Sequence, residues 1–134
     1  MVEKKQEKFY QATGRRKEST ASVRLFAGKG DSTVNGIAIS AYFPSESSQS
    51  RLAEPFRAAE TDGKFYFSAK AAGGGKVGQL DAVVLGISRA LVLFDGNLRK
   101  PLRDAGLMTR NPREKERKKY FLKKARKRPQ YSKR

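Results

Sequence analysis

Three glycines in the middle of the chain have the spacing of a phosphate-binding loop. Gly73, Gly75 and Gly78 match the pattern G-x-G-x-x-G, and Asp95 stands about where a ribose-binding acid would follow. In dinucleotide enzymes such glycines let main-chain amides at a helix N-terminus bind a pyrophosphate. That domain also needs several alternating strand–helix units, and we expect no strand after Asp95. A small nucleotide-binding enzyme is therefore one hypothesis among others.

Two further interpretations of this segment remain open. The glycines can form a tight turn from a strand into a helix. Alternatively, their exposed amides, with Gly74 and Lys76 beside them, can contact an RNA phosphate at the helix N-terminus. Residues 75–78 also match the G-x-x-G clamp of KH domains, but the flanking helix pair of that domain is not predicted here. We favour the RNA phosphate contact.

The C-terminal segment 110–134 is the most basic part of the chain. It contains 13 Lys or Arg residues, opposed only by Glu114 and Glu116, and so carries +11 of the chain's net charge of +17. Too few apolar residues accompany this charge to offset the entropy of ordering the segment. We expect it to become ordered only against a polyanion.

Aromatic residues distinguish this segment from a plain cationic arm, which would bind only nonspecifically. Tyr120, Phe121 and Tyr131 are interleaved with the basic residues and can stack on unpaired nucleobases. Pro129 prevents a continued helix and favours an extended end. Fully extended, the last twenty or so residues would reach roughly 66 Å. We expect a long basic tail whose tip binds far from the rest of the protein.

A third basic group, Arg15, Arg16 and Lys17, falls in a predicted turn over residues 14–19. It is either a solvated hairpin tip or a phosphate contact. Residues 1–109 as a whole carry a net charge of +6, so positive charge is not confined to the tail. A sequence pI near 10.5 indicates a polyanionic partner, and nucleic acid is the usual one.

The composition excludes several kinds of site. The chain has no Cys and no His, which excludes disulfides, thiolate nucleophiles, and thiol or imidazole metal sites. We expect no catalytic residues, no cofactor and no metal. The N-terminus lacks an apolar signal-peptide region, and the longest apolar run, 82–94, is interrupted by Ser88 and Arg89 and is too short to span a bilayer. We therefore expect a soluble cytoplasmic protein with no membrane partner.

The hydrophobic pattern predicts the scaffold that positions these groups. Ala21, Val23 and Leu25 alternate with outward residues, as in a half-buried strand. A stripe with helical spacing runs through Leu80, Val83, Val84, Ile87, Leu91 and Phe94. The predicted strands are 8–13, 20–26, 32–34 and 64–71, the predicted helices are 48–60, 78–94 and 97–105, and Asn35–Gly36 is a predicted tight turn.

These elements predict an α+β fold with a small, mostly antiparallel sheet and two or three helices. We place one globular, RNA-binding body in residues 1–109, which have room for a single modest core. An extended basic C-terminal tail follows in residues 110–134. We detect no internal repeats.

Segments in order along nearly the whole chain resemble one protein family. They are ATGRRKESTASV (12–23), VNG (34–36), YF (42–43), EPFRA (54–58), GGGKVGQLDAVVLGISRAL (73–91), GLMTRNPREKERKKY (106–120) and KKARKRPQYSKR (123–134). On these residues the chain resembles the bacterial ribosomal protein S-nine family of the small ribosomal subunit. The closing segment is specific to the bacterial branch of that family.

The resemblance implies a body like the second domain of ribosomal protein S-five, with a left-handed β-α-β crossover that general rules of handedness would not predict. It implies that the body docks on ribosomal RNA of the small-subunit head, among neighbouring ribosomal proteins. It also implies that the tail reaches the P-site tRNA, where Lys133 and Arg134, with Ser132 beside them, contact phosphates of the anticodon loop. Arg134 suits this role because its guanidinium pairs bidentately with phosphate.

We therefore predict a non-enzymatic, structural constituent of the small ribosomal subunit that supports translation. The alternatives are a small nucleotide-binding enzyme and a general cationic nucleic-acid-binding protein. The predicted ribosomal-RNA contacts are the basic turn, the glycine segment and the cations of the tail. They comprise Arg15, Arg16, Lys17, Gly73, Gly74, Gly75, Lys76, Gln79, Arg110, Arg113, Arg117, Lys118, Lys119, Lys123, Lys124, Arg126, Lys127 and Arg128.

Two positions depart from the pattern of the family. Asn111 stands where the family commonly has Asp after Thr-Arg, which removes a negative charge from the root of the tail. Phe121 stands where the family commonly has Gly after Lys-Lys-Tyr. If the chain has a positive φ there, Phe121 strains the bend. Phe121 can instead provide an additional stacking surface.

Overall fold

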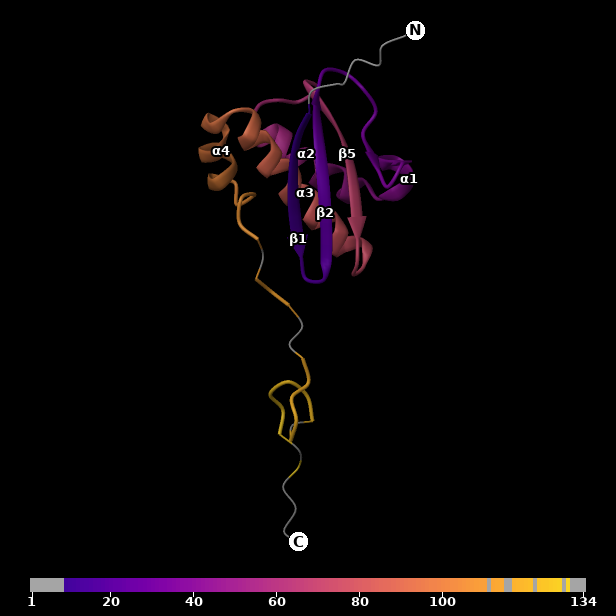
Figure 1. The fold of residues 1–134 in the computed structure, drawn as a ribbon, viewed down its shortest axis with the longest axis vertical. Helices are drawn as coiled ribbons and strands as arrows, with labels where there is room; N and C mark the ends of the chain where they lie inside the picture. The colour runs from indigo at the N-terminus through magenta and orange to yellow at the C-terminus, as the bar shows by residue number, and fades with distance from the viewer. Residues whose placement is uncertain (1–8, 111, 115–116, 122, 129, 131–134) are drawn as a thin grey trace.

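The structure is a computed structural model that describes residues 9–110, 112–114, 117–121, 123–128 and 130. Figure 1 shows strands β1, β2 and β5 in front of helices α2 and α3, with the described residues after α4 running downward from the body. The elements are β1 (Phe9–Arg16), β2 (Ser19–Ala27), β3 (Thr33–Val34), β4 (Ile37–Ala38), α1 (Ile39–Tyr42), α2 (Glu46–Ala58), β5 (Phe65–Ala72), α3 (Lys76–Phe94), the 3₁₀ helix η1 (Gly96–Leu98) and α4 (Arg99–Asp104).

The strands of the described residues form one mixed sheet in the order β1-β2-β5-β3-β4. Only β3 and β5 pair in parallel, and the other neighbouring strands are antiparallel. The prediction of an α+β fold with a mostly antiparallel sheet is thus confirmed. Helices α1 and α2 lie in the connection between the parallel strands. The left hand of that crossover remains a prediction.

The first hairpin is tighter than the sequence pattern predicts. β1 continues through Arg16, and the turn is only two residues long, beginning at Lys17 with a φ of 52°. The predicted turn over 14–19 is therefore wrong. Gly14 lies inside β1 against α3, where a β-carbon would overlap the carbonyl oxygen of Ala82. The glycine serves the close approach of strand and helix rather than a turn.

The second hairpin joins two very short strands through the predicted turn at Asn35–Gly36, whose residues both have positive φ, 54° and 78°. The Asn35 side chain extends the pairing of β3 with β5. Its amide donates to the Ala71 carbonyl oxygen (3.0 Å), and its carbonyl oxygen accepts from the Ala71 amide (2.9 Å). β4 and α1 were not predicted, because elements of two and four residues are too short to show a periodicity.

Helix α3 supplies the core. It begins at Lys76, two residues before the predicted start, and ends at Phe94, the exposed member of the predicted apolar stripe. Its buried face packs on the inner side of the sheet, where Val23 and Leu25 are fully buried. Each large side chain buried in this way stabilises the fold by ~1.5–3 kcal/mol. By length and composition α3 could cross a membrane, but 56% of its apolar window is buried inside the body, as in the core helix of a folded domain.

The remaining helices differ from the predicted bounds. α2 was predicted over 48–60 and begins and ends two residues earlier. The helix predicted over 97–105 is divided into η1 and α4. The division follows from the Asp95 carboxylate, which accepts a hydrogen bond from the Asn97 amide (3.0 Å) and caps the tight 3₁₀ turn.

Leu102 and Leu107 are buried and fix the C-terminal end of the body to the core. Beyond α4 the described residues contain no helix or strand. In Figure 1 they run away from the body and include a local turn, in which the Lys123 amide donates to the Lys127 carbonyl oxygen (2.8 Å). The extended form of the tail and the division of the chain after residue 109 remain predictions.

Candidate nucleic-acid interface

The glycine segment packs directly on the turn of the first hairpin. Ser19, the first residue of β2, is buried, and its hydroxyl donates to the Gly73 carbonyl oxygen (3.0 Å). Gly73 and Gly74 have positive φ values of 76° and 59°. A β-carbon on Gly74 would overlap the Ser19 hydroxyl, and one on Gly78 would lie 2.7 Å from it. Side chains at these positions would separate the two loops, so packing alone accounts for these glycines.

A nucleotide-binding enzyme is therefore not favoured. In the part of the chain that the structure describes, no strand follows α3, so the alternating strand–helix units of a dinucleotide-binding domain are not present. Asp95, the candidate ribose-binding acid, accepts a hydrogen bond from the Asn97 amide instead. The glycine segment acts as a tight strand-to-helix turn.

Tyr42 and Gln79 hold the glycine segment from its other side. The Gln79 amide nitrogen donates to the Gly73 carbonyl oxygen (3.2 Å), and its carbonyl oxygen accepts from the Tyr42 hydroxyl. The Lys76 ammonium lies 5.2 Å from the centroid of the Tyr42 ring and donates to the Tyr42 carbonyl oxygen (3.4 Å). Both predicted contacts are thus engaged within the protein, but Gln79 is half-buried whereas Lys76 remains exposed.

An open groove of about 470 Å³ separates the hairpin turn from the first turn of α3. The unpaired main-chain amides and the positive end of the helix dipole favour an anion at this end of α3. The Glu114 carboxylate also lines the groove and lowers its positive potential. The lining residues are Arg16, Lys17, Glu18, Ser19, Gly74, Gly75, Val77, Gly78 and Glu114.

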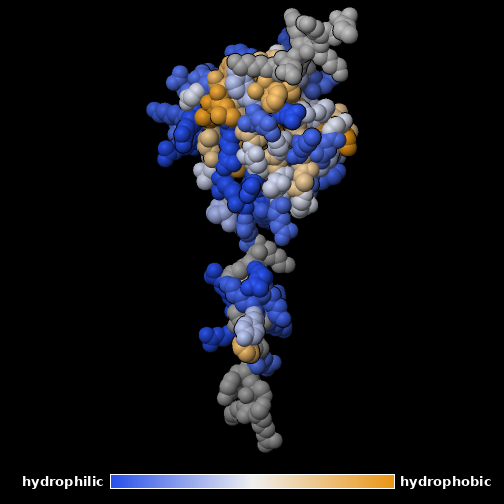
Figure 2. Space-filling model, in the orientation of Figure 1, coloured by the Kyte–Doolittle hydropathy of each residue, from blue (hydrophilic) through white to orange (hydrophobic). Residues whose placement is uncertain are grey.

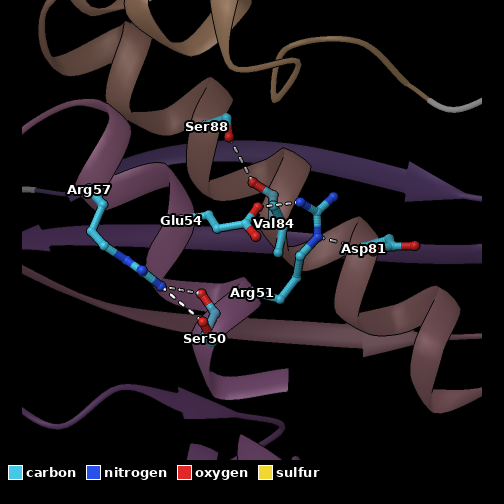
Figure 3. A network of polar contacts seen from close by, with 7 residues as sticks. All are labelled: Ser50, Arg51, Glu54, Arg57, Asp81, Val84 and Ser88. Carbon is cyan, nitrogen blue, oxygen red and sulfur yellow. Dashed lines mark hydrogen bonds and ion pairs between the residues drawn. The ribbon is translucent and has the colours of Figure 1, made fainter. Parts of the chain in front are cut away.

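The arginines of the basic turn differ in their surroundings. The Arg16 Nε lies 3.3 Å from one carboxylate oxygen of Asp81, and the Arg51 Nε lies 3.7 Å from the other. Figure 3 shows Arg51 on α2 pointing toward Asp81 on α3. Arg16 is half-buried and links β1 to α3 through Asp81, whereas Arg15 and Lys17 are exposed. The sequence alone could not show that Arg16 differs from Arg15 and Lys17, because its partner Asp81 is distant in the chain.

The root of the tail lies beside the same hairpin turn. The Arg110 Nη2 donates to the Lys17 carbonyl oxygen (3.4 Å), and the guanidinium also pairs with the Glu114 carboxylate. This contact brings the basic turn, the glycine segment and the root of the tail to one end of the body, the lower end in Figure 1. Asn111 lies outside the described residues. We call this region the hairpin end.

The predicted tail contacts that the structure describes are all exposed beyond Arg110. They are Arg113, Arg117, Lys118, Lys119, Lys123, Lys124, Arg126, Lys127 and Arg128. Tyr120 and Phe121 stack on each other in this segment, and Phe121 has a φ of 66°. The chain therefore has the positive φ at Phe121 that was expected to strain the bend. The predicted tRNA contacts Ser132, Lys133 and Arg134 lie outside the described residues.

Two further exposed cations, Arg24 and Lys70, lie on the sheet face opposite α3 and were missed by sequence reasoning. They share this face with Arg15, and the outward positions of β1, β2 and β5 contain no Asp or Glu. Figure 2 shows hydrophilic and apolar residues mixed over the same face. The signal was present in the sequence, because strand alternation places Arg24 opposite the buried Val23 and Leu25.

The arrangement at the hairpin end suits the binding of phosphates. Among the described residues, no three or more of His, Cys, Asp and Glu form a group that could bind a metal ion. The region instead combines exposed cations, free helix-terminal amides and the root of a basic tail. These groups bind phosphates without reading a base sequence. Such a surface is typical of cationic proteins that bind polyanions.

Comparison with known proteins gives the family. The family model described as Ribosomal protein S9/S16 matches residues 14–134. The chain is also 50% identical over 128 residues to the Small ribosomal subunit protein uS9 of Desulfovibrio desulfuricans, an overlap that covers 96% of this chain and 98% of that relative. The chain belongs to the ribosomal protein S9 family. It is a structural, non-enzymatic protein of the small ribosomal subunit and part of the cytoplasmic ribosome.

Proposed function

We propose that this protein binds ribosomal RNA of the small-subunit head through the hairpin end of its body and its tail, and that the tail continues to the P-site tRNA. One observation carries the proposal: segments far apart in sequence, at residues 15–19, 73–79 and 110–114, meet at this end through side-chain hydrogen bonds. Phosphate contacts fixed in this way set the orientation of a protein on RNA.

The predicted contacts divide into two groups by exposure. Arg15, Lys17 and Lys76 are exposed and bind phosphate directly. Arg16 and Gln79 act indirectly, because their side chains fix the strands and loops that present the exposed cations. Arg110 also acts indirectly, since it ties the root of the tail to the hairpin turn. Loss of an indirect residue should change RNA affinity through the shape of the hairpin end.

Residues 110–134 act as the long-range part of the protein. Their nine exposed and described cations beyond Arg110 neutralise phosphates along the way. At the tip, Lys133 and Arg134, with Ser132, contact phosphates of the tRNA anticodon loop. The support for this contact is the family resemblance, together with a bidentate guanidinium that keeps its charge. Neighbouring proteins of the small-subunit head are expected partners on the same family grounds.

Removal of the tip tests the tRNA contact. Deletion of Lys133 and Arg134 should leave subunit assembly nearly intact and weaken P-site tRNA binding, because only the distal phosphate contacts are lost. The measurement is tRNA affinity of reconstituted subunits over a salt series. A variant with Lys133→Arg and Arg134→Lys keeps the charge and is the control. Unchanged tRNA affinity in the deletion at every salt concentration would contradict the proposal.

A further inference from the structure

Tyr120 and Phe121 form an exposed aromatic pair in the tail. Their ring centroids are 4.4 Å apart, their planes are inclined by 23°, and each residue is 83% exposed. The stacked rings in the body are less exposed than this pair. Phe56 and Phe67 stack at 6.4 Å, and Phe67 is buried in the core. The tail pair therefore presents its outer ring faces to solvent, where a planar aromatic group can stack on them.

The backbone at Phe121 produces this arrangement. Neighbouring side chains of an extended chain point to opposite sides, which would keep two consecutive rings apart. The φ of 66° at Phe121 places that residue in the left-handed region and brings its ring onto Tyr120. A residue with a β-carbon adopts this region at a cost in free energy. A bound ligand that stacks on the rings would offset that cost.

The charge around the pair indicates which ligand fits. Residues 117–128 contain eight Lys or Arg and no Asp or Glu, so phosphate-binding side chains flank the rings on both sides. Lys118 and Lys119 precede the pair and Lys123 and Lys124 follow it, all exposed. Alternation of aromatic faces with cations is the usual construction of a site for single-stranded nucleic acid, because the rings stack on bases and the cations bind the backbone.

We propose that Tyr120 and Phe121 form a stacking platform for an unpaired nucleobase of RNA. The inference rests on the proposed RNA binding of the tail and specifies its ligand: a single-stranded nucleotide, whose base stacks on an outer ring face while flanking lysines bind the adjacent phosphates. Duplex RNA does not fit the platform in the same way, because its bases are already stacked within the helix.

The test uses the full-length protein and a short single-stranded RNA that carries one 2-aminopurine, whose fluorescence falls when the base stacks. The wild-type protein should quench this fluorescence on binding. A variant with Tyr120→Leu and Phe121→Leu keeps apolar side chains but lacks ring faces. It should bind roughly 5- to 150-fold more weakly, with little quenching and an unchanged salt slope.

Two control variants separate stacking from charge and from the proposed function. Tyr120→Phe keeps both rings and should behave as wild type. Lys118→Gln with Lys119→Gln should reduce the salt slope and leave the quenching of bound RNA unchanged. Equal affinity and quenching for the double Leu variant and wild type would overturn the platform while RNA binding stands. If the wild-type protein binds neither single-stranded nor ribosomal RNA, the proposed function fails as well.

Discussion

The body and the tail use the same basic residues in different ways. In the body, the guanidinium groups of Arg16 and Arg51 share the carboxylate of Asp81 and are partly buried. In the tail, the described cations beyond Arg110 are exposed and belong to no helix or strand. Arg110 stands at the boundary, bound to the hairpin turn on one side and paired with Glu114 on the other.

The comparison shows that a charge count does not identify an RNA-binding residue. A guanidinium that pairs with a carboxylate inside the protein fixes the positions of strands and helices, and its charge is already balanced. An exposed cation outside the folded core acts differently. When it binds a polyanion, it contributes to affinity mainly through the release of counterions. Substitutions that break the ion pairs of Arg16 and Arg51 should therefore change mainly the stability of the fold. Substitutions of exposed cations should change mainly RNA affinity and its salt dependence.

Removal of residues 110–134 should have the largest effect. We expect RNA affinity near 50 mM salt to fall roughly a thousandfold, about 4 kcal/mol, because 13 cations are lost. The slope of log affinity against log salt should become much shallower, while the denaturant midpoint of the body changes little. Filter binding over a salt series and denaturant unfolding measure the two quantities. A truncated protein that keeps the full salt slope would contradict the view that the tail provides most of the phosphate contacts.

Gly14→Ala tests the rigidity of the body. The new β-carbon would overlap the Ala82 carbonyl oxygen, which cannot move without displacing α3. We expect the free energy of unfolding to fall by about 3 kcal/mol. Gly96→Ala is the matched control, because no heavy atom lies within 4 Å of its added β-carbon. It should change stability by no more than about 0.5 kcal/mol. Similar losses for the two variants would argue against close packing at Gly14.

Asp81→Asn separates a structural ion pair from a surface pair. Loss of the carboxylate leaves the partly buried Arg16 without its charged partner, and we expect destabilisation by about 1–2 kcal/mol. Glu114→Gln removes the same charge from the more exposed pair with Arg110 and should cost about 0.5 kcal/mol or less. Thermal unfolding of both variants gives the comparison. A larger loss of stability for Glu114→Gln than for Asp81→Asn would contradict the view that the pair of Arg16 with Asp81 is the structural one.

Arg24 and Lys70 on the outer sheet face should make only a small contribution to RNA affinity. Arg24→Gln with Lys70→Gln removes two exposed cations, and we expect the salt slope to decrease by no more than about 2 and affinity to fall several-fold. Arg99→Gln with Lys100→Gln removes the same charge from α4 and is the control. If both double variants lose affinity equally, the sheet face has no specific role.

The long, regular elements could be predicted from the sequence, whereas the short ones could not. The alternation in β2 and the apolar stripe of α3 follow from one buried face each, and the structure confirms both. Gly14 was misread as a turn residue, because the sequence does not show that a helix lies against the strand there. In the candidate site, basic composition identified the hairpin turn and tail. It could not show that Arg16 and Gln79 are engaged by distant residues.

The most direct test of the account is to find which end of the body faces RNA in the assembled subunit. The chain has no Cys, so single-cysteine variants can carry a tethered hydroxyl-radical source at one position. Lys17→Cys lies at the hairpin end. Lys64→Cys precedes β5 at the opposite end of the sheet, roughly 25 Å away along the strands. Strong cleavage of ribosomal RNA from Lys17→Cys and weak cleavage from Lys64→Cys is the predicted result, and the reverse pattern would contradict the account.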